Sequence, residues 1–217
     1  HLRNAVAYAI NKKELVDGVY NGVHTVAKSV LAPAVFGYSE NIKTREYDLA
    51  KAKEEIALSK YPNGVEFNLI TTSSRNTGCQ LLQYQLSQIG LKMNVEFVPN
   101  VPDRTKSGYS GAYWTAMGFS SFDGGEMNMA FTKEGNVNYN YYSNEKLDVL
   151  LKKINAEKDE AKRKAMLEEA QQIVADDQPW VPLFYTKFYV AVNKNVKGVK
   201  LSPNSTHIFM DAYVEIE

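Results

Sequence analysis

The strand–helix–strand pattern of residues 65–98 limits the possible folds of this chain more than any other feature of its sequence. Apolar residues alternate with polar ones in 65–70 and again in 91–98, as in strands with one buried face. Between them, residues 76–88 have helical spacing and lead to Gly90, a suitable helix C-cap. Strands that are joined through a helix by short loops lie parallel and side by side. We therefore predict an α/β domain.

Capping residues predict further helices on both sides of this crossover. Asn11 and Glu14 form a capping box, and Asp48, Asn144 and Asp159 each precede a segment with helical periodicity. We expect helices at residues 2–10, 15–20 and 126–131. Three more should follow the caps Asp48, Asn144 and Asp159, and Pro179 should end the helix that begins after Asp159. The charged residues of the last two helices are expected on a solvated face: Lys152, Lys153, Glu157, Lys158 and Arg163.

Three more segments, 113–119, 180–192 and 207–216, have the composition of strands. Residues 21–47 lack a sustained period and contain Gly22 and Pro33, which predicts a long loop. Because the chain has no internal repeat and no low-complexity linker, a single α/β domain is the economical interpretation.

Charge and cysteine content exclude several classes of function. The 25 Lys and Arg residues balance 25 Asp and Glu residues, so the basic excess with which nucleic-acid binders neutralise phosphates is missing. The single cysteine, Cys79, can form neither an internal disulfide nor a cysteine zinc cluster, and its place in an apolar helical stripe predicts a buried side chain. His1, His24 and His207 match no metal-ligand spacing.

The sequence also shows no catalytic constellation. It contains no Gly-x-Ser-x-Gly elbow and no Walker loop, and no apolar run approaches the roughly 18 residues that span a bilayer. We therefore expect a protein that is not an enzyme and that holds no metal or cofactor. Helical spacing begins at the first residues, with no leader before them, so we expect an excised piece of a longer protein.

Aromatic residues and glycines are interleaved between residues 109 and 142, which makes this stretch the candidate ligand surface. Ligands of open α/β sheets bind beyond the carboxyl ends of the strands, where residues 120–125 should lie. Gly124 and Gly125 would allow the backbone to turn tightly there and to approach a ligand. Alternatively, the aromatic side chains only fill the core beneath the loop.

Five motifs, in order along the chain, are similar to those of the family 5 extracellular solute-binding proteins, which include the dipeptide, oligopeptide and nickel receptors of ABC importers. The motifs are residues 2–12 (LRNAVAYAINK), 47–53 with 61–64 (YDLAKAK and YPNG), 86–95 (LSQIGLKMNV), 170–183 (AQQIVADDQPWVPL) and 195–198 (NVKG). The chain resembles the C-terminal lobe of these proteins.

The resemblance implies a type II periplasmic-binding-protein lobe, with a mixed, mostly parallel sheet flanked by helices. Residues 1–217 would form a single ligand-binding lobe of a two-lobed protein, and residues from about 206 to 217 would lead back toward the missing N-terminal lobe. Family members trap a ligand between their lobes and deliver it to a membrane permease. We therefore expect an extracytoplasmic protein that is periplasmic or lipid-anchored on the outer face of the cell membrane.

The expected site departs from the family pattern. Peptide-binding members carry Gly-Trp-x-x-Asp, whose aspartate pairs with the α-amino group of the peptide; here Gly118–Phe122 matches this motif, and Asp123 comes one residue late. A one-residue shift in an extended segment turns a side chain to the opposite face. The expected ligand-binding residues are Phe119, Ser120, Phe122 and Asp123, with Asn138 and Tyr141 from the following loop.

A peptide is the expected ligand. The displaced carboxylate also leaves open a sugar or another small polar solute. A third interpretation is an interaction or sensing module that uses the same lobe.

Overall fold

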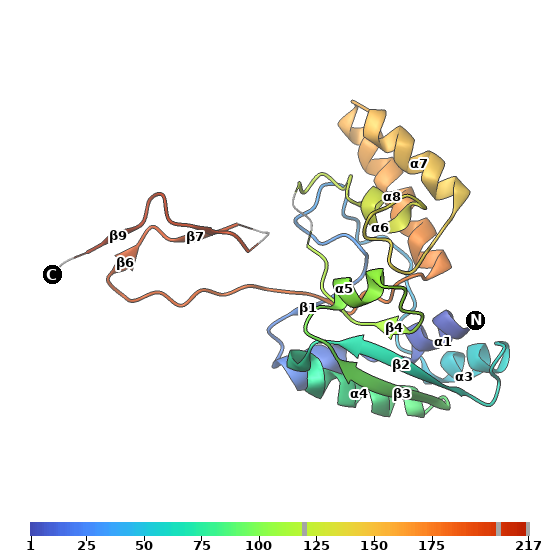
Figure 1. The fold of residues 1–217 in the computed structure, drawn as a ribbon. Helices are drawn as coiled ribbons and strands as arrows, with labels where there is room; N and C mark the ends of the chain where they lie inside the picture. Colours follow the sequence, from blue (N-terminus) through green and yellow to red (C-terminus); the bar gives the residue numbers. More distant parts are fainter. Residues whose placement is uncertain (119–120, 203–204, 216–217) are drawn as a thin grey trace.

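A parallel three-stranded sheet forms the centre of the computed structural model, which describes residues 1–118, 121–202 and 205–215. Its strand order is β3-β2-β4, with β2 at Val65–Thr71, β3 at Leu91–Phe97 and β4 at Ala112–Tyr113 (Figure 1). The first residues of β2 and β3, Val65 and Leu91, are paired, and so are their last residues, Thr71 and Phe97. The predicted parallel crossover is therefore confirmed, and the carboxyl ends of the strands share one edge.

The two turns that precede β2 and β3 touch each other at the opposite edge of the sheet. Gly64 has a φ of +84°, and a Cβ atom on it would lie 1.9 Å from the carbonyl oxygen of Gly90. Glycine is therefore required at position 64, because any side chain would push the two turns apart.

Helices cover the sheet and confirm most of the predicted caps. The crossover helix α4 is Asn76–Ser87, preceded by the 3-10 turn η2 at Ser73–Arg75, and α1 (Leu2–Ala9) packs against α3 (Leu49–Ala57). The Asn11 side chain accepts a hydrogen bond from the Glu14 N–H at 3.1 Å, and the Asp48 carboxylate accepts one from the Lys51 N–H at 3.0 Å. After the short helix α2 (Lys12–Glu14), the helix expected at 15–20 is a π-helix, η1 (Leu15–Val19).

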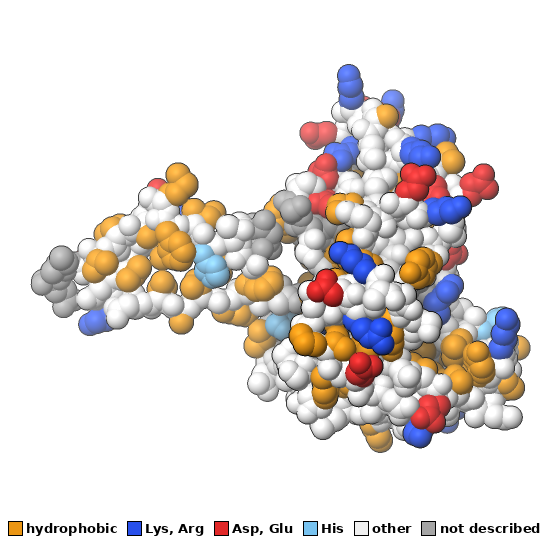
Figure 2. Space-filling view, viewed as in Figure 1, with side chains coloured by type: hydrophobic (Ala, Val, Ile, Leu, Met, Phe, Trp, Pro, Cys, Tyr) orange, Lys and Arg blue, Asp and Glu red, His pale blue; other side chains and the backbone are white. Residues whose placement is uncertain are grey.

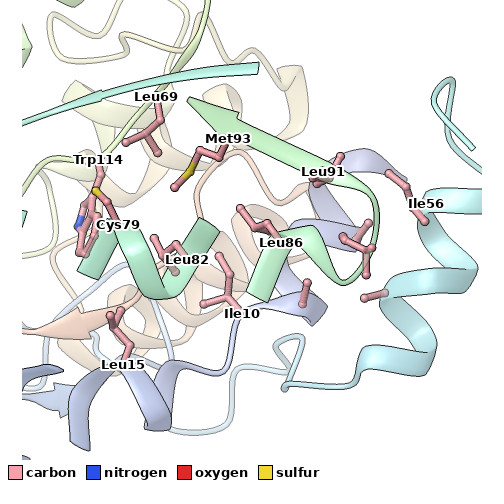
Figure 3. Packing of buried hydrophobic residues seen from close by; sticks show 14 residues of the cluster. Ile10, Leu15, Ile56, Leu69, Cys79, Leu82, Leu86, Leu91, Met93 and Trp114 are labelled. Atoms are coloured by element: carbon pink, nitrogen blue, oxygen red, sulfur yellow. The ribbon is translucent and has the colours of Figure 1, made fainter. Parts of the chain in front are cut away.

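A first hydrophobic core joins α4 to the sheet and to the N-terminal helices. Figure 3 shows Cys79, Leu82 and Leu86 of α4 directed toward Leu69 and Met93 of the strands. Cys79 is 1% exposed, so its predicted buried position is confirmed.

A second hydrophobic core lies among the helices that follow the sheet. It is built by α6 (Met127–Phe131), α7 (Glu145–Ala156) and α8 (Glu160–Asp177), together with residues of the long loop such as Leu31 and Val35. The predicted caps Asn144 and Asp159 accept hydrogen bonds from the N–H groups of Leu147 at 3.0 Å and Lys162 at 2.9 Å.

The long loop runs between the two cores and is fastened to α8 by polar contacts. The buried Ser29 hydroxyl donates to the Gln171 side chain at 2.6 Å, and Gln171 in turn donates to the Gly37 carbonyl at 2.7 Å. Arg45 donates to the carbonyl oxygens of Ala175 at 2.6 Å and Asp176 at 3.0 Å, which would otherwise lack partners at the end of α8. The loop is thus an ordered strap, and it contains one short strand, β1 (Thr25–Val26).

The predicted strands outside the crossover are mostly wrong in extent. The segment 113–119 is a strand only to Tyr113, because the chain leaves the sheet to reach α6. In the segment 180–192, only β5 (Phe184–Tyr185) is a strand, paired with β1 and with no neighbour further along. The segment 207–216 forms two short strands, β8 (His207–Ile208) and β9 (Tyr213–Val214), separated by a turn.

The described residues from 186 to 215 form a C-terminal arm that extends away from the rest of the molecule (Figure 1). Two pairs of short antiparallel strands stiffen it: β6 (Val196–Lys197) with β9, and β7 (Lys200–Leu201) with β8. No residue of the arm belongs to either hydrophobic core as far as the structure describes them.

Candidate functional site

The carboxyl edge of the sheet carries hydroxyl groups and one arginine. The Thr71 hydroxyl donates to the Trp114 carbonyl at 2.8 Å, and the Trp114 N–H donates to the Ile70 carbonyl at 3.0 Å, which fixes the exit of β4. Arg75 donates to the Thr72 hydroxyl at 2.7 Å, and its guanidinium lies 5.7 Å from the centroid of the Trp114 ring. A cation stacked on an aromatic ring keeps its outward N–H groups for an anionic partner.

Aromatic rings continue this edge and form an edge cluster of Arg75, Trp114, Phe184, Tyr20 and His24. The His24 ring stacks on Phe184 with centroids 4.8 Å apart, and Tyr20 lies 4.9 Å from Phe184. Burial, and next the nearby charge of Lys187, lowers the pKa of His24, so this ring is neutral near pH 7. Trp114 is itself buried in the first core, so the partly exposed rings of the cluster are those of Phe184, Tyr20 and His24, beside the charges of Arg75 and Lys187.

Ser121–Gly125, which we call the rim loop, turns the chain between the end of β4 and α6. At Gly124 φ is +77°, and a Cβ atom would lie 2.9 Å from both the Leu167 side chain and the Phe36 carbonyl oxygen. Phe122 has a φ of +57°, and its carbonyl accepts a hydrogen bond from the Phe36 N–H at 2.8 Å. The half-buried Phe122 ring packs against the second core. For this residue, the alternative that the aromatic side chains fill the core therefore holds in part.

Asp123 is exposed, but both of its carboxylate oxygens have protein partners. Oδ1 accepts hydrogen bonds from the Gly125 N–H and the Ser121 hydroxyl, each at 2.8 Å. Oδ2 lies 3.3 Å from a guanidinium nitrogen of Arg163, which also donates to the Asp123 carbonyl at 3.0 Å. The hydrogen bonds from Gly125 and Ser121, and then the charge of Arg163, lower the pKa of Asp123.

The sequence placed Arg163 on a solvated face, which is wrong. Its side chain is 22% exposed, and its guanidinium lies 5.4 Å from the centroid of the Phe36 ring. Helical periodicity alone did not reveal this contact, because the partners of Arg163 come from two distant loops.

The sequence interpretation missed Glu126, a buried carboxylate beside the rim loop. The side chain is 8% exposed, and Oε1 accepts hydrogen bonds from the Ser121 N–H at 2.6 Å and from the Ser121 hydroxyl. Oε2 is buried and has no hydrogen-bond partner among the described residues. The available signal was an acidic residue directly after Gly124-Gly125, at the start of a short helix.

The other predicted site residues lie apart from this group. Asn138 is buried, and its amide donates to the Thr132 and Tyr142 carbonyls and accepts from the Tyr142 N–H, so it holds its own loop together. Tyr141 is 75% exposed. Across the described ranges, no hydrogen bond or ion pair joins either residue to the rim loop. Phe119 and Ser120 lie outside the described residues.

The described residues contain no group of three or more His, Cys, Asp and Glu side chains that could hold a metal ion. Within the same ranges, every helix is too short or too polar to cross a lipid bilayer.

Residues 1–139 match the sequence profile described as bacterial extracellular solute-binding proteins, family 5 middle. The chain belongs to this family. The match covers the N-terminal helices, the parallel sheet and the rim loop. The predicted family is therefore confirmed, and the first three of the five motifs lie within the matched residues.

Family 5 relatives align with nearly the whole chain. Heme-binding protein A of Haemophilus influenzae is 27% identical over 226 residues, covering 99% of this chain and 41% of the relative. Glutathione-binding protein GsiB of Escherichia coli K12 is 29% identical over 227 residues, covering 97% of this chain and 44% of the relative. The chain thus spans less than half the length of these relatives.

Solved structures of family 5 proteins share the fold. The periplasmic binding protein DppA of Helicobacter pylori, in complex with the peptide STSA, is 30% identical with a TM-score of 0.85, covering 99% of this chain and 44% of that one. HbpA2 of Haemophilus parasuis is 26% identical with a TM-score of 0.84, covering 99% of this chain and 45% of that one. The predicted type II periplasmic-binding-protein fold is confirmed.

Proposed function

We propose that this family 5 chain is one lobe of the substrate-binding component of an ABC importer, which captures a peptide between two lobes and delivers it to a membrane permease. The observation that carries the proposal is the likeness, over nearly the whole chain, to a periplasmic binding protein in complex with a peptide. The relatives reported above are named as binding proteins, which supports a role in binding rather than catalysis.

The carboxyl edge and the rim loop together support a ligand with both charge and apolar surface. At the edge, Arg75 supplies a positive charge beside Trp114. The rim loop, which packs against Phe36 and Leu167 of the second core, supplies carboxylates. A short peptide carries a carboxylate, an ammonium group and side chains of mixed polarity, so it complements these two surfaces. We propose Phe119, Ser120, Phe122 and Asp123, with Asn138 and Tyr141, as further contacts, although Asn138 would have to give up its backbone partners.

The C-terminal arm supports the proposal of a second lobe. Two-stranded ribbons are marginal without a hydrophobic partner, and this arm exposes large apolar side chains, several of which gather on the face in Figure 2. The exposed residues are Phe188, Tyr189, Val192, Phe209, Met210, Tyr213 and Val214. Because relatives are more than twice as long as this chain, we propose that the missing lobe covers the arm, while residues up to about 185 form the ligand-binding lobe.

We propose that the whole protein lies outside the cytoplasm, either free in a periplasm or held by a lipid anchor. The family description supports the extracytoplasmic location.

The test uses the whole receptor and an equimolar library of synthetic tri- to pentapeptides. We expect native mass spectrometry to detect retained peptides, and the melting temperature to rise because a ligand that binds only the folded state stabilises it. Oligosaccharides serve as the comparison. A receptor that responds to oligosaccharides but retains no peptide would replace this proposal with the small-solute alternative.

A further inference from the structure

Two carboxylates share one hydroxyl group at the rim loop. The Ser121 Oγ lies 2.8 Å from Asp123 Oδ1 and also contacts Glu126 Oε1. A serine hydroxyl has a single proton, so it donates to only one of the two acceptors at a time. The hydroxyl therefore satisfies one of the two carboxylates at a time.

The two carboxylates differ in what balances their charge. Asp123 is exposed and pairs with Arg163 at 3.3 Å. Glu126 is 8% exposed, pairs with no cation within the described ranges, and leaves Oε2 without any partner there. A buried carboxylate without a compensating cation is unfavourable, so the Glu126 carboxylate as a whole would be stabilised by a positively charged group.

We infer that Glu126, and not Asp123, binds a cationic group of the ligand, an ammonium or a guanidinium. Asp123, counted above among the proposed ligand contacts, then acts mainly as a positioning residue, because its contacts with Gly125 and Arg163 fix the turn of the rim loop. The inference rests on the proposed function. It assigns the ligand-binding negative charge to Glu126, which lies outside the Gly118–Phe122 segment that matches the family motif.

Access to Glu126 requires only a small change. Ser121 is exposed and lies against the carboxylate through both its N–H and its hydroxyl. Rotation of the Ser121 hydroxyl toward Asp123, where an acceptor already lies at 2.8 Å, frees one side of Glu126 Oε1, which keeps its hydrogen bond from the Ser121 N–H. A ligand cation then replaces the hydroxyl proton with a stronger, charge-assisted hydrogen bond.

The experiment compares the peptide library with free amino termini against the same library after N-acetylation, on the whole receptor. Titration calorimetry on the best-retained peptide of the free-amine library then measures variants. We expect Glu126→Gln to weaken binding about ten- to a hundredfold, because a charge-assisted hydrogen bond is lost. Asp123→Asn should weaken it less than about threefold. Glu126→Asp, which keeps the charge but shortens the side chain, should lie between.

Glu169→Gln is the matched control, because Glu169 is half exposed, pairs with Lys146 and lies away from the rim loop. Each variant is first shown to have the melting temperature of the unaltered receptor, and Glu126→Asp provides the second measurement if Glu126→Gln does not fold. The inference is overturned if Glu126→Gln binds the peptide as tightly as the unaltered receptor, or if Asp123→Asn loses more affinity than Glu126→Gln. If Glu126→Gln does not fold, undiminished binding by Glu126→Asp overturns it. Failure of the unaltered receptor to retain any peptide defeats the proposed function instead.

Discussion

The sheet with its helices and the C-terminal arm contain similar residue types but differ in what surrounds them. In the sheet region, apolar side chains such as Leu69 and Leu91 are at most 7% exposed, whereas Met210 and Tyr189 of the arm are 92% and 71% exposed. A strand becomes stable when neighbours pair its backbone and cover its side chains. The strands of the arm leave their apolar side chains uncovered, whereas the remainder of the chain has its own hydrophobic interior.

The largest change in stability is expected for a substitution in the buried interior. Phe131→Ala removes a fully buried ring of the second core that lies 4.5 Å from the Trp180 ring, centroid to centroid. We expect the free energy of unfolding to fall by about 3–5 kcal/mol, because a cavity is left. Urea denaturation followed by circular dichroism measures this. A loss below about 1 kcal/mol would mean that the second core does not stabilise the chain.

A smaller effect is expected at a helix cap of the same core. The Asn144 side chain accepts from the Leu147 N–H at 3.0 Å and donates to the Asp177 carboxylate at 2.7 Å. Asn144→Ala should therefore lower the free energy of unfolding by about 1–2 kcal/mol. The control is Lys152→Ala on the exposed face of α7, for which a change within about 0.5 kcal/mol is expected. Equal effects of the two substitutions would contradict the observed cap.

The strap between the two cores should make stability sensitive to alkaline pH. Burial raises the pKa of Tyr185 to about 12, from its ordinary value of 10.0, and its hydroxyl bonds to the backbone of Ser29. Since the unfolded chain loses the phenol proton first, this contribution is complete below about pH 10 and disappears as the pH rises toward 12.

Denaturation at a series of pH values should therefore show a shallower alkaline decline for Tyr185→Phe than for the unaltered chain. Parallel declines would exclude a contribution of this hydroxyl. Tyr189→Phe in the arm is the matched control, since that ring is 71% exposed.

The smallest change in stability is expected for substitutions in the arm, and it tests most directly whether the arm is covered in the whole receptor. Met210→Ala and Phe209→Ala should change the free energy of unfolding of the isolated chain by less than about 0.5 kcal/mol. In the whole receptor the same substitutions should each cost more, because the proposed second lobe covers these side chains. Identical effects in the two contexts would show that the arm stays uncovered.

The sequence predicted the elements whose signals are local. The caps at Asn11, Asp48 and Asn144 each bond to a residue three positions further along the chain. The alternation of apolar and polar residues in 65–70 indicates a strand with one buried face. The extent of the strand at 180–192 depended instead on whether a distant neighbour was available to pair with it, and composition does not report that.

The site was predicted less completely for the same reason. The tight turn was expected from the glycines, and Gly124 has a φ of +77°. The contacts of the turn with Phe36 and Leu167 of the second core were not expected. The pairing of Asp123 with Arg163 joins residues 40 positions apart in sequence, and the burial of Glu126 follows from the packing of α6. Both depend on tertiary contacts that no periodicity encodes.

The contact between Gly64 and Gly90 has a consequence at the other end of the sheet. The two turns meet without side chains between them, so β2 and β3 start level and keep one register over their whole length. A slip of a single residue between β2 and β3 would turn the side chains of one strand to the opposite face of the sheet. The glycine contact at the amino ends of these strands therefore helps to decide which side chains the carboxyl edge presents.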